Sequence, residues 1–224
     1  MLKEKQNLIS FVESTVRDLI DCQLVDDSMT RKGKTQNSSQ HSEDLASTVF
    51  SLARDEGLIE DFVKASSQKP YDIRYSLPSE TLGPISKKDL ECTPHLLENI
   101  PDNLGLFEVK KTESGTIMLN DTIPHPSSHY LLFVLQPKNK VIQLFSGESI
   151  INALNTKLKK SKEPCPFKDV YEYREHINNL RKMTGFATRG NLVFHHKDVS
   201  SPIFTINLKK LSPRNPLTPA DSMV

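Results

Sequence analysis

Apolar residues occur along the chain in short runs, and one of these runs is unbroken. Residues 130–135 read Tyr-Leu-Leu-Phe-Val-Leu, and residues 141–145 form a second apolar run after a turn at 136–140. An unbroken run rich in strand-favouring residues is typical of a strand buried on both faces. The two runs and their turn predict a β-hairpin, which we expect at the centre of a sheet.

The first clear helical pattern lies near the N-terminus. Apolar residues recur there every three or four positions over residues 8–23, which predicts an amphipathic helix of about four turns. The apolar stripe consists of Leu8, Phe11, Val12, Val16, Leu19 and Ile20. An isolated helix of this length is marginal in water, so the stripe must pack on something. It belongs either to the core of the same domain or to a contact with a partner protein.

The polar segment after this helix favours the partner. Residues 28–42 contain one apolar residue, Met29, and are typical of a flexible linker. We therefore expect an N-terminal amphipathic helix over 1–27, a linker over 28–42, a folded domain over 43–210 and a disordered tail over 211–224.

Within the folded domain, residues 43–63 predict two short helices separated at Gly57. Their spacing loosely follows a DNA-binding helix-turn-helix. The second helix would carry Glu60 and Asp61 with only Lys64 as a base, so phosphate groups would repel it. A plain helical hairpin is the better interpretation.

Periodicity places the remaining elements. Strict alternation over 71–77 predicts a half-buried strand that ends at Pro78. The remaining predicted elements are a helical turn over 93–100, a hairpin formed by 107–111 and 116–120, helices over 148–160 and 167–183, and strands over 192–194 and 203–206. Short turns between strands indicate antiparallel pairing. The predicted fold class is α+β, with an antiparallel sheet of about five to seven strands, helices packed on one face and an N-terminal helical segment.

Charge is unevenly distributed along the chain, although the net charge is only +1. Residues 138–197 hold twelve Lys and Arg against five Asp and Glu, a balance of +7, whereas residues 43–61 have a balance of −5. Such asymmetry indicates either a surface for an acidic partner or two halves that attract each other. The candidate anion-binding or nucleic-acid-binding residues are Lys157, Lys159, Lys160, Lys162, Arg181 and Lys182.

The cysteines and the hydropathy favour an intracellular protein, nuclear or cytoplasmic. Cys22, Cys92 and Cys165 are odd in number and widely spaced, which suggests neither a disulfide framework nor a zinc knuckle. No apolar run of signal-peptide type and no span near twenty apolar residues occurs. We expect no membrane span.

Motifs of known chemistry are missing from the sequence. It contains no glycine-rich phosphate loop, no Gly-x-Ser-x-Gly and no His-Glu-x-x-His. His195 and His196 would point to opposite faces of an extended strand, so they would not chelate one ion together. We therefore expect that the protein is not an enzyme and has no catalytic residue, cofactor, metal site or small-molecule substrate.

One segment resembles a known family. Residues 143–149 (Gln-Leu-Phe-Ser-Gly-Glu-Ser), with Ala153 and Leu154, are similar to the strand-to-helix end of the pleckstrin-homology-like domain in a eukaryotic family of meiotic double-strand-break accessory proteins. The likeness covers about twenty residues, and this chain departs from the family by continuing with a further helix and two strands. The resemblance implies a chromosome-associated accessory role in meiotic recombination and assigns no site residue.

Two hypotheses about function follow. The first is a non-enzymatic protein-protein interaction subunit of an intracellular, nuclear complex, which binds its partners through the N-terminal helix and the sheet. The second is a protein that binds nucleic acid or another anionic surface through its basic half, with steep salt dependence.

Overall fold

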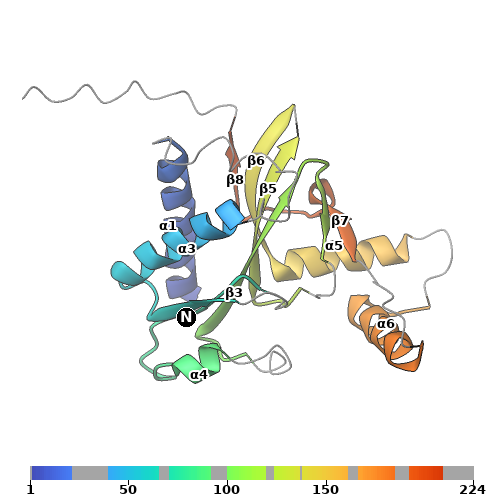
Figure 1. Ribbon diagram of the computed structural model, residues 1–224, viewed down its shortest axis with the longest axis horizontal. Coiled ribbons are helices and arrows are strands. Elements are labelled where there is room, and N and C mark those ends of the chain that lie inside the picture. Colours follow the sequence, from blue (N-terminus) through green and yellow to red (C-terminus); the bar gives the residue numbers. More distant parts are fainter. Residues whose placement is uncertain are drawn as a thin grey trace, which may run out of the picture.

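In the part of the chain that the structure describes, the protein is a six-stranded sheet with helices on both faces and a two-stranded sheet beside it (Figure 1). The computed structural model describes residues 2–21, 40–65, 71–91, 100–119, 124–136, 138–160, 166–184 and 192–208. The class is α+β, as predicted, and the N-terminal helix is present. Among the described residues, no helix has the length and apolar character that crossing a bilayer requires.

The helices and strands have the following bounds. The helices are α1 (Leu2–Asp21), α3 (Gln40–Asp55), α4 (Lys87–Leu90), α5 (Gly147–Lys159) and α6 (Val170–Thr184), and a 3₁₀ turn, η3, spans His196–Asp198. The large sheet contains, in spatial order, β1 (Asp61–Lys64), β2 (Ile73–Ser76), β3 (Leu104–Thr112), β5 (Ser128–Gln136), β6 (Asn139–Ser146) and β8 (Phe204–Asn207). The small sheet pairs β4 (Thr116–Met118) with β7 (Val193–His195).

The apolar run at 130–135 is an inner strand, β5, and all six of its residues are buried. Its side chains alternate between two cores, because successive residues of a strand face opposite sides of the sheet. Leu131 and Phe133 lie in the core beneath α1 and α3, while Tyr130, Leu132 and Val134 lie in the core beneath α5. The prediction of a strand buried on both faces is confirmed. The turn to β6 is shorter than predicted, since Gln136 already pairs with Asn139.

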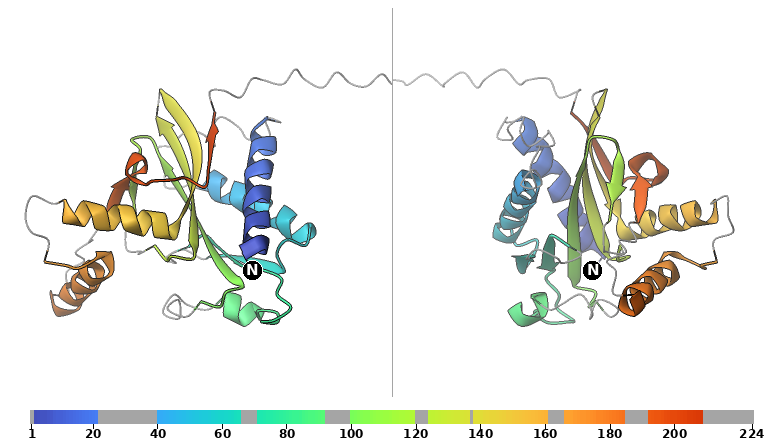
Figure 2. Two further views of the ribbon diagram at one scale, coloured as in Figure 1. Left: turned by 180° about the vertical axis from the view of Figure 1, so that it is seen from behind. Right: turned by 45° about the vertical axis from the view of Figure 1, so that its right-hand side comes forward.

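Helices cover both faces of the sheet, whereas we expected them on one. The edge-on view in Figure 2 shows α1 and α3 on one side and α5 and α6 on the other. The inner strands carry apolar side chains on both faces of the sheet, so other elements must shield each face from water. α1 and α3 cover one face, and α5 with the small sheet covers the other.

The pairing of β3 and β4 differs from the predicted second hairpin. β3 pairs with β5 in parallel, and β4 leaves the large sheet to pair with β7. The turn between them diverts the chain. Gly115 has φ +82, a region that favours glycine, and Thr112 Oγ1 donates to the Thr116 carbonyl and accepts from Gly115 N. The sheet is therefore mixed, although most of its pairs are antiparallel.

The predicted second helix after Gly57 is also wrong, because residues 61–64 form the edge strand β1. The Phe62 ring lies 6.0 Å from that of Phe50 on α3, and Phe62 pairs with Tyr75 of β2. β2 is buried on both faces rather than half-buried, and even Arg74 is 4% exposed, with its guanidinium 5.5 Å from the centre of the Tyr71 ring.

The start of α5 is fixed by a cap and a close backbone contact. Ser146 Oγ accepts a hydrogen bond from Ser149 N at 3.2 Å, which is typical N-cap geometry. A Cβ atom on Gly147 would lie 1.9 Å from the carbonyl oxygen of His125, so only glycine fits there.

Several predictions concern residues outside the described ranges. They are the helical turn over 93–100, for which only residue 100 is described, the tail over 211–224, the three cysteines and most of the linker over 28–42. The final three linker residues belong to α3, which begins at Gln40 rather than after Ser42.

Candidate interaction surfaces

The apolar stripe of α1 lies in the protein's own core. Leu8 and Val12 are each 2% exposed and Val16 is fully buried, all in the cluster that contains Leu131 and Phe133. Phe11, Leu19 and Ile20 are partly buried against the same cluster. Binding a partner through these residues would require α1 to leave the sheet. In this conformation the α1 stripe packs against the protein's own core and is not exposed to a partner.

α1 also closes one edge of the sheet. Arg17 Nη2 donates to the carbonyl oxygen of Thr205 on β8, at 3.4 Å, and forms an ion pair with Glu13 at 2.7 Å. β8 is the last strand of the large sheet. The predicted interaction helix therefore contributes one hydrogen bond to a sheet edge, and a charged side chain at an edge disfavours unwanted strand pairing.

The predicted basic residues are only partly brought together. Lys157, Lys159 and Lys160 are exposed at the C-terminal end of α5, and Lys182 is exposed on α6. Lys157 Nζ donates to the carbonyl oxygen of Val193 on β7, at 2.8 Å. Lys162 lies outside the described residues, and the side chain of Arg181 is not among those described. Lys157 is thus engaged by the fold rather than by a ligand.

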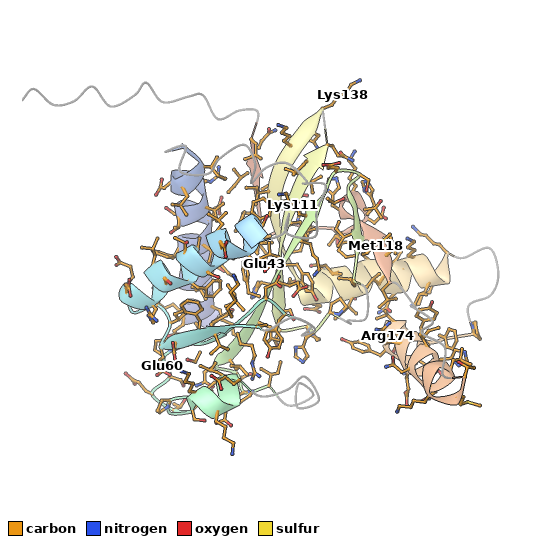
Figure 3. The ribbon with its side chains drawn as sticks, viewed as in Figure 1. Glu43, Glu60, Lys111, Met118, Lys138 and Arg174 are labelled. Carbon is orange, nitrogen blue, oxygen red and sulfur yellow. The ribbon has the colours of Figure 1, made fainter. Side chains whose placement is uncertain are left out.

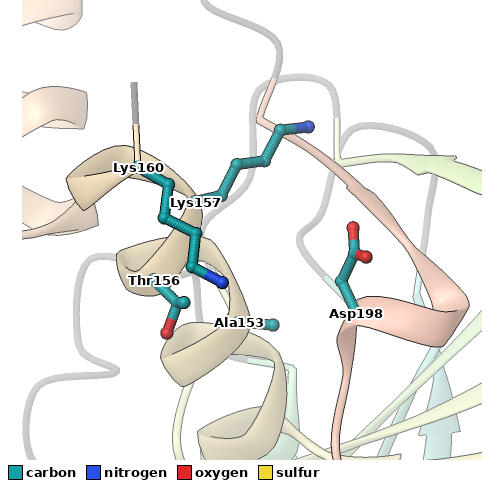
Figure 4. A pocket seen from close by; sticks show the side chains of 5 residues that line it. All are labelled: Ala153, Thr156, Lys157, Lys160 and Asp198. Carbon is teal, nitrogen blue, oxygen red and sulfur yellow. The ribbon is translucent and has the colours of Figure 1, made fainter. Parts of the chain in front are cut away.

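A hollow of about 460 Å³ lies between α5 and η3 (Figure 4). Ala153, Thr156, Lys157 and Lys160 line it from one face of α5, as their three- and four-residue spacing requires. Asp198 lies across from them and accepts a hydrogen bond from His195 N at 3.3 Å. Among the described residues, no acceptor bonds to Lys160 Nζ. One unengaged ammonium group facing a carboxylate offers at most weak anion binding.

α6 is anchored to the body of the protein at its N-terminal end. Asp169 Oδ1 caps the helix by accepting hydrogen bonds from Tyr171 N and Glu172 N, both at 3.0 Å. Val170 is fully buried, and its N–H donates to Asn155 Oδ1 of α5 at 2.9 Å. Tyr171 Oη donates to the carbonyl oxygen of Pro124 at 3.1 Å. The first turn is therefore fixed in place.

The C-terminal half of α6 extends beyond both cores. Ile177 and Leu180 continue the apolar stripe of Val170 and Tyr173, yet they are only partly buried and belong to neither core cluster. Met183 is 82% exposed, the largest value among the exposed apolar residues of the described ranges. We call Ile177, Leu180 and Met183 the α6 surface. Figure 1 shows the helix at the margin of the molecule, beyond α5.

One charged residue of α6 is buried. Arg174, labelled in Figure 3, is 3% exposed, although it lies beside rather than on the apolar stripe. Its position four residues after the buried Val170 is the signal that would have placed it on the inner face.

The two adjacent histidines lie together, contrary to prediction, because the chain turns into η3 at His196. Their rings are 4.8 Å apart. His195 Nδ1 accepts from Lys197 N at 3.2 Å, so the proton of the neutral ring is on Nε2. His196 Nδ1 lies 2.9 Å from Gln143 Oε1 and donates to it, because the Gln143 amide nitrogen donates to Thr205 Oγ1.

The two rings leave one nitrogen lone pair unengaged. His195 Nδ1 accepts a hydrogen bond, whereas His196 Nε2 is buried without a hydrogen-bond partner in the described structure. Burial, helped by the positive charges near it, lowers the pKa of His196 to about 4, which keeps that ring neutral. Within the described ranges, no group of three or more His, Cys, Asp and Glu side chains is placed to hold a metal.

A buried group of charges lies on β3, on the α5 side of the sheet. Glu108 is 3% exposed and pairs with Lys110, while the neighbouring Asp72 accepts from Val109 N through Oδ2 at 2.6 Å. Desolvation, together with the charge of Asp72, raises the pKa of Glu108 from 4.5 to about 7 despite Lys110. Glu108 Oε2 is buried without a hydrogen-bond partner in the described structure.

Comparisons with known proteins add no assignment. No family model matches the chain, and neither the curated proteins nor the solved structures give a match. Residues 143–154 do form a strand followed by an amphipathic helix, as in the family they resemble, but no comparison supports that resemblance.

Proposed function

We propose that the protein is a non-enzymatic subunit of an intracellular protein complex, nuclear or cytoplasmic, and that it binds a partner through the α6 surface. The observation that carries this proposal is the exposure of an apolar helical stripe. Ile177 and Leu180 are partly exposed outside both cores, and Met183 is 82% exposed. Apolar side chains gathered on one face of a surface helix are typical of a protein contact.

This proposal moves the partner contact from α1 to α6. The α1 stripe is already buried against the sheet, so using it for a partner would first expose Leu8, Val12 and Val16 to water. Each fully buried aliphatic side chain contributes about 1.5–3 kcal/mol, so displacing three of them costs several kcal/mol. Binding at the α6 surface requires no such rearrangement.

Site-specific photo-crosslinking in the cell that makes the protein tests the proposal. A photoreactive phenylalanine analogue at position 183 is compared with the same analogue at position 82, because Leu82 is also exposed, at 54%, and lies far along the chain. We expect a discrete cross-linked partner from position 183 that Ile177→Asp abolishes. The same products from both positions, or none from position 183, would contradict the proposal.

A second function, binding of nucleic acid or another anionic surface, is favoured by one observation. Lys159, Lys160 and Lys182 are exposed, and Lys160 lines the hollow between α5 and η3 without a hydrogen bond to its Nζ among the described residues. The chromosome-associated role implied by the family resemblance belongs to this alternative.

A titration against duplex and single-stranded DNA at two salt concentrations tests this second function. Lys160→Glu is compared with Lys88→Glu, since Lys88 is exposed on the short helix α4. We expect binding that weakens steeply with salt and falls several-fold in Lys160→Glu alone. Equal loss in both variants would indicate only a general effect of net charge.

A further inference from the structure

We infer that the hollow between α5 and η3 binds a small aminocarboxylate, a molecule that carries one ammonium group and one carboxylate. The site is separate from the α6 surface, so its occupancy does not depend on a partner protein there. Opposite charges on the two walls, the fixed position of Asp198 and a small residue between the walls together favour such a ligand.

The two walls of the hollow carry opposite charges that do not meet. Lys160 lies on the α5 wall and Asp198 on the η3 wall, and Figure 4 shows the ammonium group and the carboxylate on opposite sides of the space. Among the described residues, neither side chain forms an ion pair. A ligand with both charges can engage the two walls at once, with its carboxylate toward Lys160 and its ammonium group toward Asp198.

The Asp198 carboxylate is held in place by the chain around it. Its Oδ2 atom accepts from His195 N at 3.3 Å, while His195 Nδ1 accepts from Lys197 N, which together form a capping box at the start of η3. Within the described ranges, no donor bonds to Asp198 Oδ1. The cap therefore fixes one oxygen and leaves the other to a ligand, so little side-chain freedom is lost on binding.

The α5 wall offers one cation for the ligand. Lys157 Nζ donates to the carbonyl oxygen of Val193, which ties α5 to β7. Thr156 Oγ1 donates to the Asn152 carbonyl at 2.8 Å, so its hydroxyl hydrogen is used within the helix. Of the polar side chains that line this wall, Lys160 is left to bind a carboxylate.

A small side chain provides the space. Ala153 lines the hollow and is 9% exposed, and the volume is about 460 Å³. Ligand sites in proteins typically measure about 300–1,000 Å³, so a small molecule can be accommodated. The methyl group of Ala153 also gives the carbon chain of the ligand an apolar contact. A larger residue here would fill the hollow without changing either charge.

Ligands with a single charge fit the hollow less well. An anion is attracted by Lys160 and repelled by Asp198, and a cation meets the reverse. Both side chains are exposed, and water weakens exposed ion pairs, so we expect a dissociation constant in the millimolar range.

Backbone amide NMR of the full-length chain tests the inference. The probe is 6-aminohexanoate, and the controls at equal ionic strength are hexanoate and hexylamine, which each carry one of its two charges. We expect saturable shifts at the amides of residues 153–160 and 195–198, with binding about fivefold tighter for the probe than for either control. Equal affinity for the probe and hexanoate, or no saturable shift at about 50 mM probe, would overturn the inference.

Three substitutions separate recognition from a general effect of charge. Asp198→Asn keeps an oxygen that accepts from His195 N, so the η3 cap remains while the charge is lost, and probe binding should fall about fivefold. Ala153→Leu should abolish saturable binding although both charges remain. Lys159→Gln is the control, because Lys159 is exposed on α5 and does not line the hollow. Equal weakening by Lys159→Gln and Asp198→Asn would contradict a built site.

A charge reversal gives a gain of binding, which loss of folding cannot mimic. Lys160→Glu places carboxylates on both walls, so we expect this variant to lose 6-aminohexanoate and to bind 1,6-diaminohexane, which the native chain does not favour. A Lys160→Glu chain that still binds 6-aminohexanoate as tightly as the native chain, or that shows no gain for the diamine, would show that the two walls do not act together on one ligand.

Discussion

Glu108 shows how strongly the sheet perturbs a single ionisable group. Its carboxylate is buried on β3 beside Asp72, and the two share Lys110. Removing a carboxylate from water costs more than one lysine returns, so the pKa of Glu108 is raised from 4.5 to about 7. In an unfolded chain the same group titrates near its ordinary value.

The sign of the resulting pH dependence follows from proton binding. Between pH 4.5 and 7 the folded state holds more protons on Glu108 than the unfolded state, so this group lowers the free energy of unfolding as pH rises through that window. A shift of this size corresponds to roughly 3–4 kcal/mol. Glu108→Gln should therefore match the native chain near pH 5 and exceed its stability at pH 8, as measured by urea unfolding.

His196 changes the free energy of unfolding with pH in the opposite direction, so the comparison must account for it. Its pKa is lowered to about 4, so its contribution to stability is present above pH 6.5 and is lost as pH falls towards 4. Comparing Glu108→Gln with the native chain at each pH cancels this effect. A difference that stays the same at pH 5 and pH 8 would show that Glu108 is ionised at both.

At the scale of elements, α1 is part of the sheet's core rather than an independent arm. Val16 is fully buried in the cluster that also contains Phe133 of β5. We expect Val16→Ala to lower the free energy of unfolding by about 1–3 kcal/mol while leaving a single cooperative transition, followed by circular dichroism. Ser14→Ala, at an exposed position of α1, should change stability by less than about 0.5 kcal/mol.

Removing α1 extends this comparison. Deletion of residues 1–27 should expose the apolar face beneath it and increase the binding of a hydrophobic dye. A truncated chain as stable as the full one would mean that α1 is detachable, which would restore it as a candidate partner-binding helix.

Elements with a strong local pattern were predictable from the sequence. The helix expected over 148–160 spans Gly147–Lys159, and β5 lies where the unbroken apolar run placed it. β1 was missed because Leu58, Ile59, Phe62 and Val63 suit either a helix or a strand. Pairing of Phe62 with Tyr75 and its packing on Phe50 decide between them, and both contacts are distant in sequence.

The candidate surface was predictable only in part. The apolar stripe of α6 is visible in the sequence, but its exposure is not, because exposure depends on where α5 and the sheet end. Lys157 illustrates the same limit. Its charge indicated anion binding, yet the carbonyl of Val193 engages it. The local sequence pattern predicts which side chains share one face of a helix. Tertiary structure determines whether other parts of the protein cover that face.

At the scale of the whole molecule, side chains form hydrogen bonds to three of the edge strands that the structure describes. Arg17 bonds to Thr205 on β8, Lys157 bonds to Val193 on β7, and Asp61 Oδ1 accepts from Phe62 N on β1. Charged side chains at strand edges discourage pairing with another chain. This pattern is a further reason to place the partner contact on a helix.

A core substitution tests whether the small sheet opens separately, although Phe194 shares a core with Tyr130 and Leu132 of the large sheet. Phe194 on β7 is 1% exposed and pairs with Ile117 of β4. We expect Phe194→Ala to cost about 3–5 kcal/mol and to speed hydrogen exchange most at Leu119 N and His196 N, which bond across the small sheet. Phe133→Ala, in the large sheet, should instead speed exchange throughout. Equal loss of protection everywhere in Phe194→Ala would mean that the two sheets unfold as one unit.

The pairing of β4 with β7 also matters while the protein is being made. Met118 pairs with Val193, so a ribosome must add 75 residues after β4 before its partner exists. At roughly 5–20 residues per second, β4 stays unpaired for about 4–15 s. During that time Ile117, which the folded protein buries, is exposed to other nascent chains. The large sheet is also incomplete until β8 has been synthesised, because β8 follows β7 in the chain. This interval is when the chain is most open to chaperones and most sensitive to its rate of synthesis.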